Sequence, residues 1–225
     1  MRIDVITLFP EIVLAPSRES IIGRAQREGI LELHAHNLRD WATDKRQTVD
    51  GPLCGGGQGM LLKPEPLFAA IEELRTKDAL VVLLTPQGKV FKQAVAAELS
   101  AQNHLILVCG HYEGVDQRVI DELIDLELSI GDYVLTNGAV SAAVVIDAVV
   151  RLLPDALGNE LSAEEESFSD PHLLEAPNYT KPINFKGFEV PKVLSSGNHQ
   201  LIIEWRNRQA VKRTKTNRPD LRPSV

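Results

Sequence analysis

Three glycine-bearing segments of this chain each follow a run of apolar residues. They are Leu83 to Gly88, Cys109 to Gly114 and Ser129 to Gly138. Glycine adopts backbone conformations that other residues avoid, and it leaves neighbouring N–H and C=O groups uncovered. Three such loops at strand ends predict one pocket lined by backbone, suited to a small, flat, polar ligand.

The residues around these loops predict the elements that position them. Alternating or continuous apolar runs are typical of strands at 2–8, 30–36, 79–85 and 104–109. Helical spacing predicts helices at 64–74, 91–99, 117–124 and 139–153. The last of these is apolar nearly all round, which predicts a buried helix. This alternation indicates an α/β fold, with a parallel sheet covered by helices on both sides.

The chain changes character after Leu153. Prolines, glycines and the acidic run Glu164 to Glu166 predict an irregular connection, with a domain boundary near Asp170. Further on, a helix is expected at 198–212. Its arginines would point outward, and its inward residues would be Leu201, Ile202, Trp205 and Val211.

Composition limits the class of protein. The 225 residues are 44% hydrophobic, which predicts one substantial core and a smaller module. Cys54 and Cys109 stand apart from any metal-ligand spacing, so a disulfide framework and a structural zinc site are not expected. The charged amino terminus and the lack of any run of roughly 20 apolar residues predict a chain without signal peptide or membrane span. A reducing cytoplasm is the expected location.

Charge is distributed unevenly along the chain. The formal net charge is -7, yet the 21 residues from Trp205 to Val225 hold seven lysines and arginines against one aspartate. That segment carries +6, so the residues before it carry -13. A basic segment on an acidic protein is either a solvated tail or a site for a polyanion such as nucleic acid, and the acidic remainder favours the second interpretation.

Six short motifs follow one another along the chain: Arg46 to Asp50, Gly55 to Met60, Pro86 to Gly88, Tyr112 to Arg118, Ser129 to Leu135 and Ser196 to His199. In their order and spacing the chain resembles the bacterial tRNA (guanine-N1)-methyltransferase family over nearly its full length. Each motif alone is weak evidence, but six in order make coincidence improbable. The resemblance implies transfer of a methyl group from S-adenosyl-methionine to N1 of guanine 37 in tRNA, the nucleotide 3′ of the anticodon.

The resemblance also implies a fold. Members of this family are similar to SPOUT methyltransferases, whose parallel sheet contains a deep trefoil knot, followed by a small, mainly helical carboxy-terminal domain. The expected division is a knotted donor-binding domain at 1–160, a loop with the catalytic carboxylate at 161–170, and a basic tRNA-binding domain at 171–225. In the family, backbone groups of the knot loops hold S-adenosyl-methionine. The matching positions are Leu84, Pro86, Gln87, Gly110, Tyr112, Glu113, Gly114, Ile130, Gly131, Tyr133, Leu135 and Gly138.

Guanine N1 must lose a proton before it attacks a methyl group, so the reaction needs a general base. The family places an aspartate in the interdomain loop, and this chain has Glu166 there. Glu166 is the predicted base, with Glu165 and Asp170 in reserve. Arg151 is predicted to assist the base or to neutralise charge on guanine O6. A cap at the end of its helix is the alternative role for Arg151.

The substrate loop departs from the family pattern. An aromatic residue and a proline usual in the family are replaced by Cys54 and Gln58, so a stacking surface for RNA is missing there. The resemblance still implies substrate contacts along the chain. Those expected are Asp50, Gly55, Gly56, Gly57, Gly59, Ser196, Asn198, Arg206, Arg208, Lys212 and Arg213.

Partners follow from the same resemblance. A homodimer is expected, with the active site shared between subunits, together with tRNA and no membrane. No protein metal site is predicted; His34 and His36 share a strand face but have no third ligand. Mg2+ could support activity through substrate and water. Two alternatives stay open: a related enzyme acting on another RNA base, and an RNA-binding relative with weakened catalysis.

Overall fold

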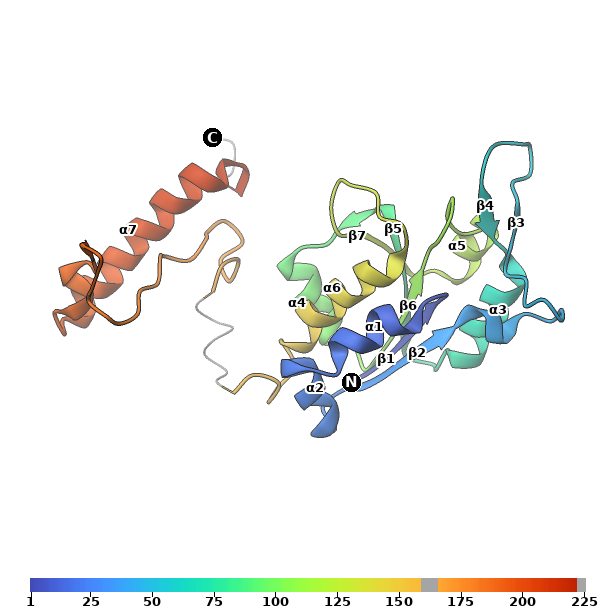
Figure 1. Cartoon of the computed structure of the whole chain (residues 1–225), viewed down its shortest axis with the longest axis horizontal. Coiled ribbons are helices and arrows are strands. Elements are labelled where there is room, and N and C mark those ends of the chain that lie inside the picture. The colour runs from blue at the N-terminus through green and yellow to red at the C-terminus, as the bar shows by residue number, and fades with distance from the viewer. Residues whose placement is uncertain (159–165, 222–225) are drawn as a thin grey trace. The chain divides into compact units, whose positions relative to one another are not determined.

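The computed structural model describes residues 1–158 and 166–221. The chain divides into two compact units, residues 1–158 and 159–225, here called unit 1 and unit 2 (Figure 1). The three-part division at 160 and 170 stays a prediction. In the described ranges, no helix is both long and apolar enough to cross a membrane.

Unit 1 is built on a five-stranded, wholly parallel sheet (Figure 1). The strand order is β2-β1-β6-β5-β7. The strands are β1 (Arg2–Thr7), β2 (Glu32–Asn37), β5 (Ala79–Val90), β6 (His104–Cys109) and β7 (Leu126–Ser129). β6 is buried along its whole length, as its continuous apolar sequence predicts for a central strand. The expected α/β architecture with a parallel sheet is therefore confirmed.

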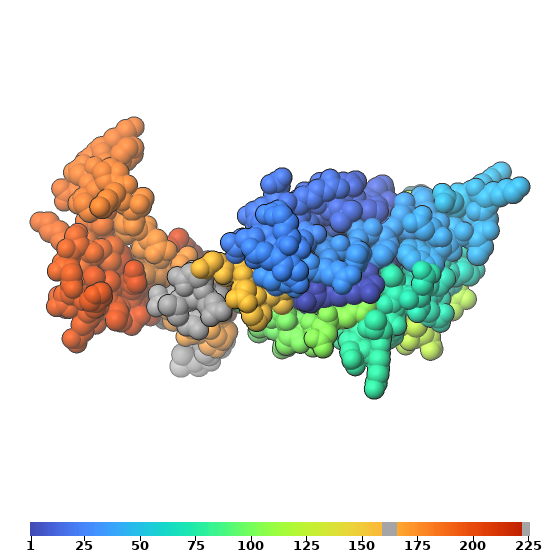
Figure 2. All heavy atoms as spheres, turned by 90° about the horizontal axis from the view of Figure 1, so that it is seen from below, coloured from blue at the N-terminus to red at the C-terminus, as the bar shows by residue number. Residues whose placement is uncertain are grey.

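Helices cover both faces of this sheet and create two cores. One core packs β-strand residues such as Val5 and Leu107 against α1 (Pro10–Ser17), α2 (Ser20–Arg27), α4 (Gln93–Ser100) and α6 (Gly138–Val150). The other packs Ile106 and Val108 against η1 (Leu38–Trp41), α3 (Pro64–Leu74) and α5 (Gln117–Leu123). Segments up to α3, blue to teal in Figure 2, cover much of the visible face of unit 1. Because successive residues of a strand point to opposite faces, adjacent β6 residues serve different cores.

Two predicted elements differ from the structure in ways that matter for the pocket. The strand expected at 79–85 continues to Val90, because Pro86 to Gly88 form an irregularity within β5, where its register with β7 shifts. The helix expected to be buried all round, α6, exposes Val140 and Val144 at 43% and 45%. Its buried residues pack against the sheet and against α1 and α4, and one apolar side is left exposed.

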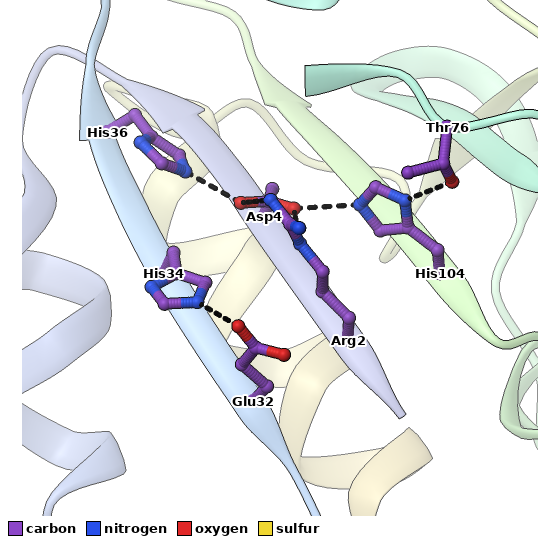
Figure 3. A network of polar contacts seen from close by, with 7 residues as sticks. All are labelled: Arg2, Asp4, Glu32, His34, His36, Thr76 and His104. Atoms are coloured by element: carbon purple, nitrogen blue, oxygen red, sulfur yellow. Dashed lines mark hydrogen bonds and ion pairs between the residues drawn. The ribbon is translucent and has the colours of Figure 1, made fainter.

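A buried carboxylate lies in the sheet, in the half of β1 nearer the amino end (Figure 3). Asp4 in β1 accepts hydrogen bonds from Arg2 Nε, and it lies 2.7 Å from both His36 Nε2 and His104 Nε2. Thr76 Oγ1 contacts the other nitrogen of His104 at 2.8 Å. Burial by itself raises the pKa of Asp4. The hydrogen bonds from Arg2, His36 and His104 lower it by more, so the pKa of Asp4 lies below its ordinary value.

Asp4→Asn is expected to lower the free energy of unfolding by about 3 kcal/mol at pH 5, because it removes the charged partner of a buried network. Because the pKa of Asp4 is lower in the folded protein than its ordinary value of 3.8, the carboxylate stabilises the fold at pH values above 3.8. That stabilisation is lost as the pH falls through the lower pKa of the folded state. The difference in free energy of unfolding between wild type and variant should therefore be smaller at pH 3 than at pH 5. Unfolding by denaturant at both pH values measures this difference. Equal stability at pH 5 would contradict the assignment.

Unit 2 is smaller, and its described part combines helices, a short hairpin and irregular segments. Its longest element is α7 (His199–Asn217), preceded by the hairpin β8 (Asn184–Phe185) and β9 (Phe188–Glu189) and by η3 (Lys192–Ser195); η4 (Pro219–Leu221) follows it. Asn198 caps α7 by accepting a hydrogen bond from the Leu201 N–H at 3.2 Å. The predicted inward face was wrong for Leu201 and Val211, which are 47% and 42% exposed. Small residues, Ala210 and Thr214, are buried instead.

Candidate functional site

The three glycine-bearing segments meet at one cavity of about 480 Å³. It lies where β5, β6 and β7 end or are interrupted, and β6 and β7 flank β5 on opposite sides. In parallel sheets, ligands bind at the carboxyl ends of strands where successive connections run to opposite sides. The cavity is lined by every residue predicted for the methyl donor: Leu84, Pro86, Gln87, Gly110, Tyr112, Glu113, Gly114, Ile130, Gly131, Tyr133, Leu135 and Gly138.

Gly138 lets α6 begin against the end of β6. A side-chain carbon at Gly138 would lie 2.8 Å from Cys109 Cα and 2.9 Å from Gly110 N, which no larger residue tolerates. The Gly138 N–H donates to the Gly110 carbonyl at 2.8 Å, and the side chain of Asn137 caps α6 by accepting from the Ala139 N–H. The loops after β6 and before α6 are thus joined directly.

The loop after β6 has an unusual backbone. Tyr112 has a positive φ of 56° although it is not glycine, a conformation that costs free energy and is held by its surroundings. Its ring lies 4.2 Å from the ring of His111, which contacts Phe9 edge-on at 5.3 Å. In the described part of the chain, His111 Nδ1 is buried without a hydrogen-bond partner. These rings fix one wall of the cavity.

Sequence reasoning did not assign several residues of the cavity wall. Among them are Leu61, Gln117, Thr136, Asn137 and Ser141. Asn137 had a readable signal, because asparagine before a helical run is a preferred cap. The local sequence around Leu61 and Gln117 gave no such signal, since only tertiary folding brings these residues to the cavity.

The thiol of Cys109, the residue before Gly110 of the cavity wall, is buried. Burial raises its pKa to about 12, so it stays protonated and serves as a packing residue.

The substrate loop is carried on a hairpin beside this cavity. β3 (Asp50–Pro52) and β4 (Met60–Leu62) pair in antiparallel fashion and hold residues 53–59 at their tip. The Glu113 N–H donates to the Met60 carbonyl at 3.0 Å, and the Leu62 N–H donates to the Gly114 carbonyl at 3.0 Å. The expected glycine loop therefore borders the predicted donor pocket.

The tip of that hairpin requires glycine. Gly55, Gly56, Gly57 and Gly59 all have positive φ, and a methyl group at Gly59 would collide with the carboxylate of Glu113. Asp50 is half-buried at the base of the hairpin, and Cys54 is exposed at its tip. Bare backbone at the tip can approach a nucleotide closely.

The two groups predicted for catalysis lie in different units. Arg151 is half-buried in unit 1 and directly follows α6 as its C-cap, where its N–H donates to the Asp147 carbonyl at 3.4 Å. Glu166 is half-buried in unit 2, in a turn in which the Ser169 N–H donates to the Glu166 carbonyl at 3.2 Å. Glu165, the first reserve candidate, lies outside the described residues, and Asp170 is exposed.

Basic side chains on α7 are open to a polyanion. The five cations Arg206, Arg208, Lys212, Arg213 and Lys215 are exposed and make no hydrogen bond or ion pair with any residue that the structure describes. Arg218 differs, because it pairs with Asp220 at 2.6 Å. The side chains of Ser196 and Asn198 are engaged in the entry to α7.

No metal-binding cluster is found across 1–158 and 166–221, where no three His, Cys, Asp or Glu side chains gather closely enough to hold an ion. His34 contacts Glu32, and His36 contacts Asp4.

Comparison with known proteins gives the family. Residues 1–224 match the family model described as tRNA (Guanine-1)-methyltransferase TrmD. The chain is 50% identical over 221 residues to the tRNA (guanine-N(1)-)-methyltransferase of Carboxydothermus hydrogenoformans, covering 98% of this chain and 87% of that protein. The protein of the same name from Heliobacterium modesticaldum is 54% identical over 228 residues, covering 98% and 84%. That from Dictyoglomus turgidum is 51% identical over 221 residues, covering 98% and 89%. The chain therefore belongs to the tRNA (guanine-N1)-methyltransferase family.

Proposed function

We propose that the cavity of unit 1 binds S-adenosyl-methionine and that the enzyme methylates N1 of guanine 37 in tRNA. One observation carries this proposal: the twelve residues expected to hold the donor all line one cavity, in a chain whose family uses that donor. The alternatives, another RNA base or a weakened paralogue, have no such support.

The cavity suits this ligand. Its volume of about 480 Å³ falls within the range of small-molecule sites. Leu84, Ile130 and Leu135 offer apolar surface to a flat adenine, while the glycines at 110, 114 and 131 leave backbone groups accessible for hydrogen bonds. When bound, the donor supplies a methyl group already activated on a sulfonium.

The protein must then deprotonate the acceptor. In the proposed mechanism the Glu166 carboxylate takes the proton from guanine N1, and the Arg151 guanidinium neutralises negative charge that grows on O6. The glycine loop at 55–59 and Asp50 hold the guanine edge beside the cavity. The hydrogen bonds that tie β4 to the 113–114 backbone support this placement of the loop.

A homodimer with a shared site is proposed, one subunit holding the donor and the other presenting Glu166 and Arg151. An exposed apolar surface supports it. Tyr133, Val134 and Leu135 are 54%, 84% and 39% exposed, and they precede the helix that exposes Val140 and Val144. Burial of these exposed apolar side chains would stabilise association. We further propose that the sheet of unit 1 contains a trefoil knot and that the protein acts in the cytoplasm. Mg2+ bound through substrate and water would assist the reaction.

Donor binding and transfer test this function together. Isothermal titration with S-adenosyl-methionine should show saturable binding, and a tRNA transcript with guanine at position 37 should gain a labelled methyl group. The same transcript with adenosine at 37 should gain none. No heat at high micromolar donor, or equal labelling of both transcripts, would overturn the proposal.

α7 is proposed to bind tRNA phosphates, so affinity should fall steeply with salt. The double variant Lys212→Ala, Arg213→Ala should bind tRNA about 10-fold more weakly at low salt, and the slope of log affinity against log salt should drop by about two. Arg218→Ala is the matched control. Because Arg218 is already paired with Asp220, its loss should cost less. Filter binding across a salt series measures this; an unchanged slope in the double variant would exclude α7.

A further inference from the structure

A second cavity, of about 470 Å³, lies within unit 2. Its walls come from the segment 177–183, from the region around η3, and from α7. Pro177, Ile183 and Ile202 give apolar surface, and Tyr179 contributes its ring. The volume is sufficient for a small ligand or one unit of a polymer.

The charges at this cavity favour an anion. Lys181 and Arg206 line it, and neither side chain makes an ion pair or hydrogen bond within the described ranges. No carboxylate lies among the described residues of its wall. Arg206 also begins the row of exposed cations on α7. The cavity therefore opens onto the surface proposed to contact RNA phosphates.

An aromatic ring lies beside these cations. Tyr179 is 50% exposed, and its only ring contact in the part of the chain that is described is with Trp205, at 6.2 Å between centroids and tilted by 56°. Part of the phenol surface is therefore open to a flat partner. Unpaired bases stack on such rings, while neighbouring arginines and lysines hold their phosphates.

We propose that this cavity binds one unpaired nucleotide of the tRNA substrate, with its base against Tyr179 and its phosphate between Lys181 and Arg206. A paired base cannot enter, because its flat faces are covered by stacking within the stem. The α7 cations would contact phosphates of any strand, whereas the cavity would favour RNA with a loop. The inference rests on the proposed function, since it takes tRNA as the ligand.

Trp205 offers a direct readout. The chain has only two tryptophans, and the other, Trp41, lies in unit 1. In a Trp41→Phe background, an anticodon stem–loop RNA should change Trp205 fluorescence and bind about 10-fold more tightly than a fully paired duplex with the same number of phosphates. Equal affinity for both RNAs without a fluorescence change would overturn the proposal. The proposal would also be overturned if guanosine monophosphate quenched Trp205 fluorescence in a saturable way while the stem–loop did not quench it.

Two substitutions locate the effect. Tyr179→Leu should lose the preference for the stem–loop, while Tyr179→Phe should keep it because the ring remains. Arg208→Ala is the matched control on α7, because Arg208 is exposed but does not line the cavity; it should weaken both RNAs equally. A Tyr179→Leu protein with wild-type preference would contradict the assignment. If that variant does not fold, Lys181→Ala, which alters an exposed and unpaired side chain, takes its place with the same expectation.

Failure of this inference is distinguishable from failure of the methyltransferase assignment. If the wild type methylates tRNA but Tyr179→Leu discriminates the two RNAs as the wild type does, the cavity assignment alone is wrong. If the wild type prefers the stem–loop through Tyr179 but transfers no methyl group, the proposed function is wrong and the nucleotide site stands.

Discussion

Glu166→Gln is expected to lower the rate of methyl transfer by about 10²- to 10⁴-fold, the usual contribution of a general base. The amide keeps the size of the side chain but cannot accept the proton of guanine N1. The affinity for S-adenosyl-methionine should not change, because Glu166 is not part of the cavity wall. Single-turnover kinetics at saturating donor and tRNA separate these two effects.

Three control variants test whether the effect belongs to this carboxylate. Glu166→Asp restores the residue usual in the family and should retain most of the activity. Glu165→Gln and Asp170→Asn alter the neighbouring acids and should have small effects. Near-normal turnover by Glu166→Gln would show that Glu166 is not the general base. A large loss of methyl-transfer rate in Glu165→Gln or Asp170→Asn would assign that role to Glu165 or Asp170 instead.

Gly110→Val is expected to weaken binding of S-adenosyl-methionine by at least about 100-fold, since it fills space that the ligand needs. A side-chain carbon at Gly110 has only the Leu84 carbonyl oxygen within 4 Å, at 3.7 Å, so the substitution fits the fold. Gly110 does not have a positive φ, and valine is not strained there. Because both Gly110 and Leu84 line the cavity, the added methyl groups should occupy it.

Gly158→Val is the matched control for this variant. Gly158 also has ordinary φ, and an added carbon has only the Arg24 side chain within 4 Å, at 3.9 Å. It is not in the cavity wall. Both variants should unfold at nearly the wild-type temperature, and only Gly110→Val should lose donor binding in calorimetry. Wild-type affinity in Gly110→Val would place the donor elsewhere.

The sequence predicted four of the five strands of the sheet, because β5 and β6 contain continuous apolar runs and β1 and β2 alternate between apolar and polar residues. His104–Cys109 is buried throughout, and a short apolar run bounded by turns favours such a strand. The range of β7 was not predicted, since this strand has only 4 residues. α1 and α2 were not predicted. α1 contains Pro16 and α2 contains Gly23, and proline and glycine are both unfavourable inside a helix, so neither segment was recognised as helical. The β3–β4 hairpin was missed because its strands have only 3 residues each.

Family resemblance named the residues that line the cavity proposed for the donor, and local pattern gave only its glycine loops. The interruption of β5 at Pro86 to Gly88 could not be read from sequence, because it depends on the register with β7. The prediction of which residues of α7 face inward was wrong because it also depends on what the helix packs against. With a small unit to pack against, the helix buries Ala210 and Thr214 and leaves larger apolar residues exposed.

The most direct test of the central claim is mass mapping of the nucleotide that this protein methylates. Unmodified tRNA is incubated with wild-type protein and isotopically labelled S-adenosyl-methionine, digested by nuclease, and the labelled fragment is sequenced by mass spectrometry. The account predicts a single labelled methyl group on N1 of guanine 37. Label on another base or at another position, or no label while donor binding is intact, would contradict it.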